Sequence, residues 1–263
     1  MNPFKSILRA GRKYKTGVIL SGGGARGFAH AGILKALNEA DIYPDVVSGV
    51  SAGAIVGAFY SDGYSPYEIF DIFSQEKKFF NYAKISVPKA GLFRTIGLEE
   101  NLSKNLRAQT FEDLKIPLFI AATNMNEGRI EYFNSGELVD RIIASASIPV
   151  LFQPVEIKGT HYIDGGVIDN FPITPIMGDC RKIIGVSLNP IQSENNFNTI
   201  VHIAERAFRL SVSSNISPKI SHCDLVFEPE ELGKYGLLDV SKGQEMFDLG
   251  YQMASRKLES AKL

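Results

Sequence analysis

Residues 18–40 read VILSGGGARGFAHAGILKALNEA and contain, in order, a short apolar run, a glycine-rich turn and an amphipathic segment. The first three residues are typical of a buried strand. Within residues 28–40 the apolar side chains of Ile33, Leu34 and Leu37 recur at helical spacing, which predicts a helix with one face in a core. The sequence therefore predicts a unit of strand, turn and helix, the building block of α/β proteins.

The same unit is repeated a few residues later. Residues 45–48 (DVVS) predict a second short strand, and residues 52–60 (AGAIVGAFY) are apolar on every side, as in a helix packed under other layers. Further strands are predicted at 118–122, 130–133, 182–186 and 224–227, and helices at 137–146 and 198–213. This alternation predicts an α/β fold with a largely parallel central sheet.

The overall composition is that of a globular protein and excludes several classes of function. The chain has 263 residues, of which 44% are hydrophobic and 22% charged, and its net charge is −1. Without an overall positive field, no nucleic-acid partner is expected. Its two cysteines, Cys180 and Cys223, are interpreted as free thiols in a reducing, cytoplasmic compartment, and no apolar run approaches the ~20 residues that span a bilayer.

The N-terminus and one internal segment each allow two interpretations. Residues 1–16 form a basic leader before a single domain at 17–263, and this leader is either solvated or a short helix that contacts an anionic membrane surface. Residues 77–94 are rich in aromatic side chains but follow no clean period, because Pro88 and Gly91 interrupt them. They are interpreted either as a lid over an apolar pocket or as part of the core.

The sequence Gly49-Val50-Ser51-Ala52-Gly53 is a G-x-S-x-G motif between the second predicted strand and its helix. Glycines without a Cβ allow a sharp turn that projects the serine hydroxyl at the helix N-terminus, where developing negative charge is favoured. This context predicts a nucleophile elbow with Ser51 as the nucleophile. The alternative is a turn that is merely packed with small residues.

The turn GGGARG at residues 22–27 presents consecutive main-chain N–H groups that can bind an oxyanion. The same letters satisfy G-x-G-x-x-G, the dinucleotide-binding fingerprint, which also expects an acidic residue at the end of the second strand. That end holds Ser48 and Gly49, whereas Asp45 stands at the beginning of the strand. A nucleotide-binding protein is therefore the weaker alternative.

The turn Asp164-Gly165-Gly166, after the strand-like residues 160–163, supplies a candidate base. An aspartate hydrogen-bonded to a serine hydroxyl can accept its proton, although a carboxylate with an ordinary pKa of ~3.9 is a weak base that burial would strengthen. Taken alone, such a turn is ordinary loop chemistry.

The histidines do not complete a Ser–Asp–His triad. Two of them, His30 and His161, precede any suitable acid in that order, while His202 and His222 lie on a predicted helix and strand. The histidines and cysteines also lack zinc-ligand spacing, so neither a metal nor an organic cofactor is expected.

Taken in order, GGGARG at 22–27, GVSAG at 49–53, the small-residue segment ASASIP at 144–149 and DGG at 164–166 make the chain resemble the patatin-like phospholipases. The resemblance extends from about residue 15 to residue 189. It implies a three-layer α/β/α sandwich and a Ser–Asp dyad without a catalytic histidine, which hydrolyses lipid acyl esters.

The resemblance also implies a role for each matching residue. Ser51 would be the nucleophile, Asp164 the base, and the main-chain N–H groups of Gly22, Gly23 and Gly24 the oxyanion hole. Arg26 would either position that turn or bind a phosphate group. A lipid or another acyl ester is the expected partner, and phospholipase, lysophospholipase and general esterase activities all remain open. So do a lipid transacylase with the same site and peripheral contact with a membrane.

Overall fold

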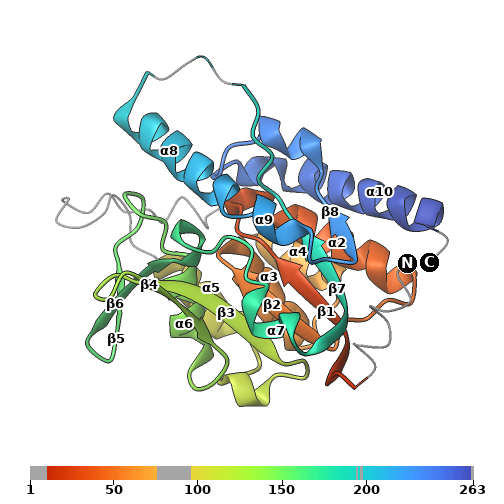
Figure 1. Cartoon of the computed structure of the whole chain (residues 1–263). Helices are drawn as coiled ribbons and strands as arrows, with labels where there is room; N and C mark the ends of the chain where they lie inside the picture. Colours follow the sequence, from red (N-terminus) through yellow and green to blue (C-terminus); the bar gives the residue numbers. More distant parts are fainter. Residues whose placement is uncertain (1–10, 76–95, 194, 196–197, 262–263) are drawn as a thin grey trace.

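The computed structural model describes residues 11–75, 96–193, 195 and 198–261, which form an α/β fold around one mixed sheet (Figure 1). The described strands are β1 (Tyr14–Leu20), β2 (Val46–Val50), β3 (Leu118–Asn124), β4 (Arg129–Phe133), β5 (Val155–Ile157), β6 (Thr160–Asp164), β7 (Cys180–Val186) and β8 (Leu225–Phe227). Their order in the sheet is β5-β6-β3-β2-β1-β7-β8, with β4 paired to β3.

The helices occupy the connections between these strands. The described α-helices are α2 (Phe28–Glu39), α3 (Ala52–Ser61), α4 (Pro66–Gln75), α5 (Ile96–Asn105), α6 (Leu138–Ser145), α7 (Thr174–Met177), α8 (Ile200–Ser214), α9 (Ser217–Ile220) and α10 (Gly243–Ala261). Short 3-10 helices are η1 (Gly24–Gly27), η2 (Phe111–Asp113), η3 (Gly165–Val167), η4 (Glu230–Lys234) and η5 (Val240–Lys242).

The central part of the sheet is parallel, as the sequence predicts. Strands β3, β2, β1, β7 and β8 pair in parallel, whereas β4 and β6 pair antiparallel to β3, and β5 pairs antiparallel to β6. The antiparallel strands lie together at the left of Figure 1. Parallel neighbours require crossover connections, and the two predicted units supply them through α2 and α3.

Helices cover both faces of the sheet, which confirms the predicted three layers. Along β1, Val18 and Leu20 pack into one apolar cluster with side chains of α2, α3, α4, α6 and α10. Ile19, between them, points to the opposite face and packs with Phe171 and with residues of α7 and α9. A strand with apolar side chains on both faces is typical of a buried parallel sheet.

The predicted element bounds hold with local differences. The strands predicted at 118–122, 130–133, 182–186 and 224–227 appear as β3, β4, β7 and β8, and the predicted helices at 137–146 and 198–213 appear as α6 and α8. Strand β1 begins at Tyr14, inside the expected leader, and the remainder of that leader up to residue 10 lies outside the described residues. The segment at 77–94, interpreted as a lid or core residues, also lies outside them. Within the described part of the chain, every helix is too short or too polar to cross a bilayer.

Strand β3 brings two distant segments together. Its residues 118–121 pair with β2, and its residues 122–124 pair with β6, while β4 occupies the opposite edge. Strands β2 and β6 therefore meet end to end along one edge of β3. Val50 pairs with Ala121 and Asp164 pairs with Ala122, so the residue after β2, Ser51, arrives beside the last residue of β6.

Candidate active site

Ser51 stands in a sharp turn between β2 and α3 with φ 54° and ψ −123°. This backbone conformation is rare and strained for a residue with a side chain. A Cβ placed on Gly49 would lie 2.4 Å from the Gly53 carbonyl oxygen, and one on Gly53 would lie 2.1 Å from the Leu20 oxygen. Both flanking positions must therefore be glycine, as the elbow hypothesis expects.

Ser145 holds this turn in place from α6. Its hydroxyl accepts a hydrogen bond from the Ser51 N–H at 2.8 Å and donates one to the Ala121 carbonyl at 2.7 Å. Two residues later, the Ser147 carbonyl accepts the N–H of Asp164 at 2.9 Å. The small-residue segment at 144–149 thus touches both candidate residues, a role that its sequence alone does not reveal.

Asp164 is almost completely buried, with 1% of its surface exposed. Its Oδ1 accepts a hydrogen bond from the Gly166 N–H at 2.7 Å, and its Oδ2 makes no bond of standard geometry with the residues the structure describes. Burial raises the pKa of Asp164 to about 7, against the opposing effect of hydrogen bonding with the Ser51 side chain and the Gly166 N–H. Asp164 therefore lies beside the Ser51 side chain, and its carboxylate is a stronger base than that of an exposed aspartate.

The glycine turn at residues 22–24 lies against the elbow. A Cβ placed on Gly22 would approach the Ser51 Cβ to 3.2 Å. The Gly22 carbonyl accepts hydrogen bonds from Asn189 Nδ2 at 2.6 Å and from the Ser21 hydroxyl at 3.0 Å, which fixes the first peptide of the turn. No hydrogen bond between described residues uses the N–H groups of residues 22–24, so they remain available as donors.

Arg26 is fully buried below this turn. Its Nε and Nη2 donate to the Tyr235 carbonyl at 3.0 and 2.6 Å, and its Nη1 donates to the Leu188 carbonyl at 3.3 Å. These contacts tie η1 to the end of β7 and to the C-terminal segment. Of the two roles expected for Arg26, they favour positioning of the turn, because a buried guanidinium is not presented to a phosphate group.

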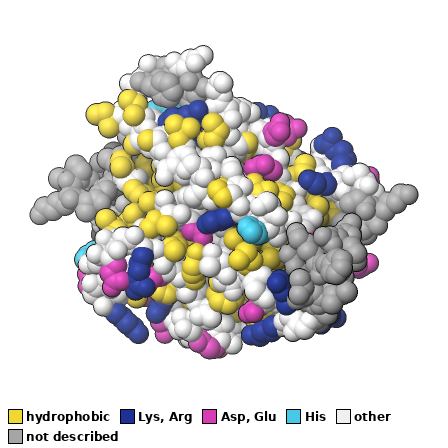
Figure 2. All heavy atoms as spheres, viewed as in Figure 1, with side chains coloured by type: hydrophobic (Ala, Val, Ile, Leu, Met, Phe, Trp, Pro, Cys, Tyr) yellow, Lys and Arg dark blue, Asp and Glu magenta, His cyan; other side chains and the backbone are white. Residues whose placement is uncertain are grey.

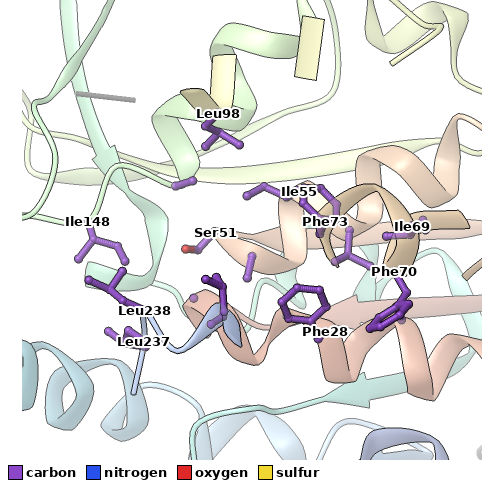
Figure 3. Close-up of a pocket in the computed structure, with 18 of the residues that line it drawn as sticks. Phe28, Ser51, Ile55, Ile69, Phe70, Phe73, Leu98, Ile148, Leu237 and Leu238 are labelled. Carbon is purple, nitrogen blue, oxygen red and sulfur yellow. The ribbon is translucent and has the colours of Figure 1, made fainter. Parts of the chain in front are cut away.

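An apolar pocket of about 110 Å³ opens beside Ser51 (Figure 3). Figure 3 shows Ser51 between aliphatic side chains on one side and the rings of α2 and α4 on the other. Among the described lining residues, Ser51 is the one with a polar side chain. Its apolar lining comprises Gly24, Ala25, Gly27, Phe28, Ala31, Ala52, Ile55, Val56, Ile69, Phe70, Phe73, Leu98, Ala146, Ile148, Phe152, Leu237, Leu238 and Val240.

The histidines lie outside this pocket lining. His30 on α2 is buried, and its Nε2 donates to the Ser21 carbonyl at 2.8 Å. Burial lowers the pKa of His30 to about 4, so the ring is neutral and helps to hold the residue before the glycine turn. Both His161 on β6 and His222 before β8 are exposed, and His202 lies on α8. The described residues contain no group of three or more His, Cys, Asp or Glu side chains placed to hold a metal ion.

Comparison with protein-family models matches residues 18–177 to the model described as "Patatin-like phospholipase". Among curated proteins, "Lysophospholipase nte1" of Aspergillus fumigatus is 27% identical over 281 residues, which cover 94% of this chain and 18% of that protein. "Lysophospholipase NTE1" of Kluyveromyces lactis is 26% identical over 284 residues, which cover 95% of this chain and 20% of that protein. The chain thus spans about a fifth of the length of these relatives.

Among solved structures, VipD from Legionella pneumophila has a similar fold. The match has a TM-score of 0.54 at 17% sequence identity and covers 95% of this chain and 69% of the VipD chain. At this identity the likeness concerns the fold, and it agrees with the mostly parallel sheet flanked by helices described above.

Proposed function

Since the chain belongs to the patatin-like phospholipase family, we propose that it hydrolyses acyl esters of lipids, with Ser51 as the nucleophile and Asp164 as the base. One observation carries this proposal: the hydroxyl on a strained elbow is the polar side chain of an apolar pocket, and it lies beside a buried carboxyl group. A pocket of this kind binds an acyl chain and leaves its ester carbonyl at the nucleophile.

In the first half-reaction, Ser51 Oγ attacks the ester carbonyl carbon while its proton passes to Asp164. Burial supports this step because it raises the pKa of Asp164 to about 7, which makes the ionised carboxylate a stronger base than an exposed aspartate. Oδ2 is the oxygen that remains for the serine proton, since Oδ1 already accepts the Gly166 N–H.

Negative charge that develops on the carbonyl oxygen needs nearby donors. The unused N–H groups of Gly22, Gly23 and Gly24 support their role as the oxyanion hole, and the contact between Gly22 and the Ser51 Cβ brings this turn next to the nucleophile. Arg26 contributes by holding η1 in place from below.

The tetrahedral intermediate then collapses and expels the alcohol, which takes the proton from Asp164, and the acyl group stays on Ser51. In the second half-reaction Asp164 accepts a proton from water as the water oxygen attacks the acyl-enzyme. Collapse of this second intermediate breaks the bond to Ser51 Oγ, which takes the proton back from Asp164, and the fatty acid leaves. Each proton that enters Asp164 also leaves it, so the cycle needs no further reactant.

Lysophospholipids are the substrate class that we infer, because the curated relatives are named lysophospholipases and the pocket beside Ser51 has an apolar lining. The test is to incubate the purified protein with a 1-acyl lysophosphatidylcholine and measure released fatty acid. Fatty-acid release that depends on Ser51 supports the proposal. If neither this lipid nor a p-nitrophenyl ester is hydrolysed, the proposal is contradicted. Acyl transfer to an added alcohol in place of water would identify a transacylase.

A bulky side chain in the pocket should select against long acyl chains. Ile55 lies one helical turn after Ser51 and lines the pocket (Figure 3), so Ile55→Trp is expected to lower kcat/KM for a p-nitrophenyl palmitate at least ~10-fold more than for the butyrate. Ile55→Val is the matched control and should change the two substrates alike. Equal losses on both esters in Ile55→Trp would show that the acyl chain lies elsewhere.

Exposed apolar side chains near the pocket support peripheral contact with lipid. Phe208 of α8 packs against an apolar cluster that includes Ile148 and Leu237, two residues of the pocket wall. On the outer side of α8, Ile200 is 84% exposed and Ile203 is 51% exposed. Figure 2 shows hydrophobic side chains gathered at the upper left, where Figure 1 places this helix. We propose that this end of α8 contacts the lipid surface from which substrate enters.

The double variant Ile200→Glu/Ile203→Glu is therefore expected to lose at least ~5-fold of its activity on vesicle-bound lipid, because burying two carboxylates in lipid is unfavourable. Its activity on a soluble butyrate ester should stay unchanged. Tyr43→Glu, at a residue 58% exposed in the connection after α2, is the matched control. Sedimentation with vesicles gives a second readout, and undiminished binding of the double variant would rule out this contact surface.

A further inference from the structure

Asn170 fills the space between the two turns of the site. It is 2% exposed and follows Asp164 by one short 3-10 helix. A Cβ placed on Gly22 would lie 2.4 Å from the Asn170 Oδ1, and a Cβ on Gly166 would lie 2.7 Å from the same oxygen. The first glycine of the GGG turn and the last glycine of the DGG turn are therefore required by the side chain that lies between them.

The backbone around Asn170 is held on both sides. The Asn170 N–H donates to Asn215 Oδ1 at 2.9 Å, and Asn215 Nδ2 donates to the Gly166 carbonyl at 3.2 Å. The preceding residue, Asp169, is 2% exposed and accepts hydrogen bonds from Lys219 Nζ at 2.5 Å and from the Phe171 N–H at 3.0 Å. The side chain of Asn170 is thus presented to the two turns from a fixed backbone.

One polar atom of Asn170, the amide nitrogen Nδ2, is buried and makes no hydrogen bond with the described residues. An unpaired buried donor is destabilising, so it persists where function requires it. The Asn170 Oδ1 and the Asp164 Oδ1 both lie beside Gly166, at 2.7 and 2.9 Å from its Cβ position. A half-turn of the amide about its last side-chain bond exchanges oxygen and nitrogen, which would place Nδ2, in place of Oδ1, on the Gly166 side that the Asp164 carboxylate also contacts.

We propose that Asn170 is a positioning residue of this site, which keeps the glycine turn and the Asp164 turn in register around Ser51 and donates a hydrogen bond from Nδ2 to the ionised Asp164 carboxylate. This inference rests on the proposed function. Asp164 Oδ1 would accept both the Gly166 N–H and the Asn170 amide, and Oδ2 would stay open to the serine proton. Once the carboxyl group has taken that proton it is neutral, and the hydrogen bond from the amide stabilises it less. The amide therefore turns as the proton moves.

Two other ionisable side chains near the two turns are held in place by their partners. Asp169 is occupied by Lys219 and by the Tyr132 hydroxyl, which donates to its Oδ2 at 2.6 Å. Buried His30 has its pKa lowered to about 4 and stays neutral across the assay range. We expect the acid limb of kcat/KM against pH to report the ionisation of Asp164 in the free enzyme, because burial raises its pKa to about 7.

The experiment measures kcat, KM and the acid limb between pH 5 and pH 9 for the wild type and three variants with p-nitrophenyl butyrate. Asn170→Ala removes the donor, so its acid limb should move to higher pH and its plateau kcat should fall about 10-fold with KM unchanged. Asn170→Asp keeps the shape but adds a second carboxylate, which should move the limb up by about one pH unit or more. Asn215→Ala loosens the same backbone without removing the amide, and it should lower the plateau without moving the limb.

If the role of Asn170 is only structural, Asn170→Ala will lower the plateau kcat but leave the acid limb at the wild-type pH. That result overturns the proposal. An unmoved limb in the isosteric Asn170→Asp variant overturns it as well, which keeps the test decisive if Asn170→Ala does not fold. Failure of the proposed function would appear in the wild type, as hydrolysis that survives Ser51→Ala. Failure of the Asn170 proposal is thus seen in the Asn170 variants, and failure of the proposed function is seen in the comparison of the wild type with Ser51→Ala.

Discussion

Ser51→Ala is expected to lower kcat for ester hydrolysis by about 10⁴-fold or more, because it removes the atom that carries the acyl group. The substitution deletes one hydroxyl at a side chain that is 4% exposed and leaves the elbow and the pocket in place. KM for a p-nitrophenyl ester should therefore change little, since the apolar lining that binds the acyl chain is intact. Initial rates over a range of ester concentrations separate the two parameters.

Ser51→Gly is the matched comparison for this loss. Glycine accepts a positive φ without steric conflict, so at φ 54° this variant should be as inactive as Ser51→Ala but more stable towards heat. A raised Tm in Ser51→Gly together with lost activity would show that the strain belongs to the active conformation. Near wild-type turnover in either variant would show that another residue is the nucleophile.

Asp164→Asn is expected to lower kcat by about 10²- to 10⁴-fold, because an amide of the same shape cannot accept the serine proton. In the wild type, burial raises the pKa of Asp164 to about 7, so kcat/KM should fall as the pH is lowered through this value. The residual activity of Asp164→Asn should lack this acid limb. A limb that persists unchanged in Asp164→Asn would assign it to a different group.

The same substitution should stabilise the folded protein above neutral pH. A carboxyl group whose pKa is raised to about 7 on folding, from an ordinary value of 3.8, holds a proton that the unfolded chain has already released. Wild-type stability therefore decreases as the pH rises between these two values, and the buried charge remains unfavourable above them. Asp164→Asn removes this effect, so its advantage in Tm should grow from pH 5 to pH 8. A lower Tm than the wild type at pH 8 would contradict the assigned burial effect.

Much of the fold could be predicted from local sequence, and so could the two residues that we propose as the dyad. The apolar runs at 18–20 and 182–186 are buried central strands, for which side chains on both faces produce continuous hydrophobic sequence. Ser51 could be found because its elbow needs glycine at both flanks, so the local geometry leaves a readable pattern. Asp164 could be found because its turn also needs small residues.

The remaining site residues depend on contacts between distant segments. Ser145 is one small residue in a row of small residues, and its hydrogen bonds to Ser51 and Ala121 appear only when α6 packs on β3. Asn170 is separated from Gly22 by most of the family-matched region, so no local pattern links them. The choice between two roles for Arg26 likewise depended on the structure, which shows that its guanidinium is buried and donates to carbonyl groups.

The sequence also missed helices that line the pocket. Helices α4 and α5 lie on either side of residues 77–94, and α4 was missed although Ile69, Phe70 and Phe73 recur in it at helical spacing. Phe73 and Leu98, one from each helix, reach the pocket wall. The sequence also could not predict that β2 and β6 meet end to end on one edge of β3, because strand register depends on the whole sheet.

Covalent labelling tests the central claim most directly. A fluorophosphonate probe reacts with an activated serine, and peptide mass spectrometry locates the adduct. For the wild type we expect one adduct, on the peptide that contains Ser51, with no labelling of Ser51→Ala and much slower labelling of Asp164→Asn. An adduct on any other serine, or equal labelling of the wild type and Ser51→Ala, would contradict a Ser51–Asp164 site.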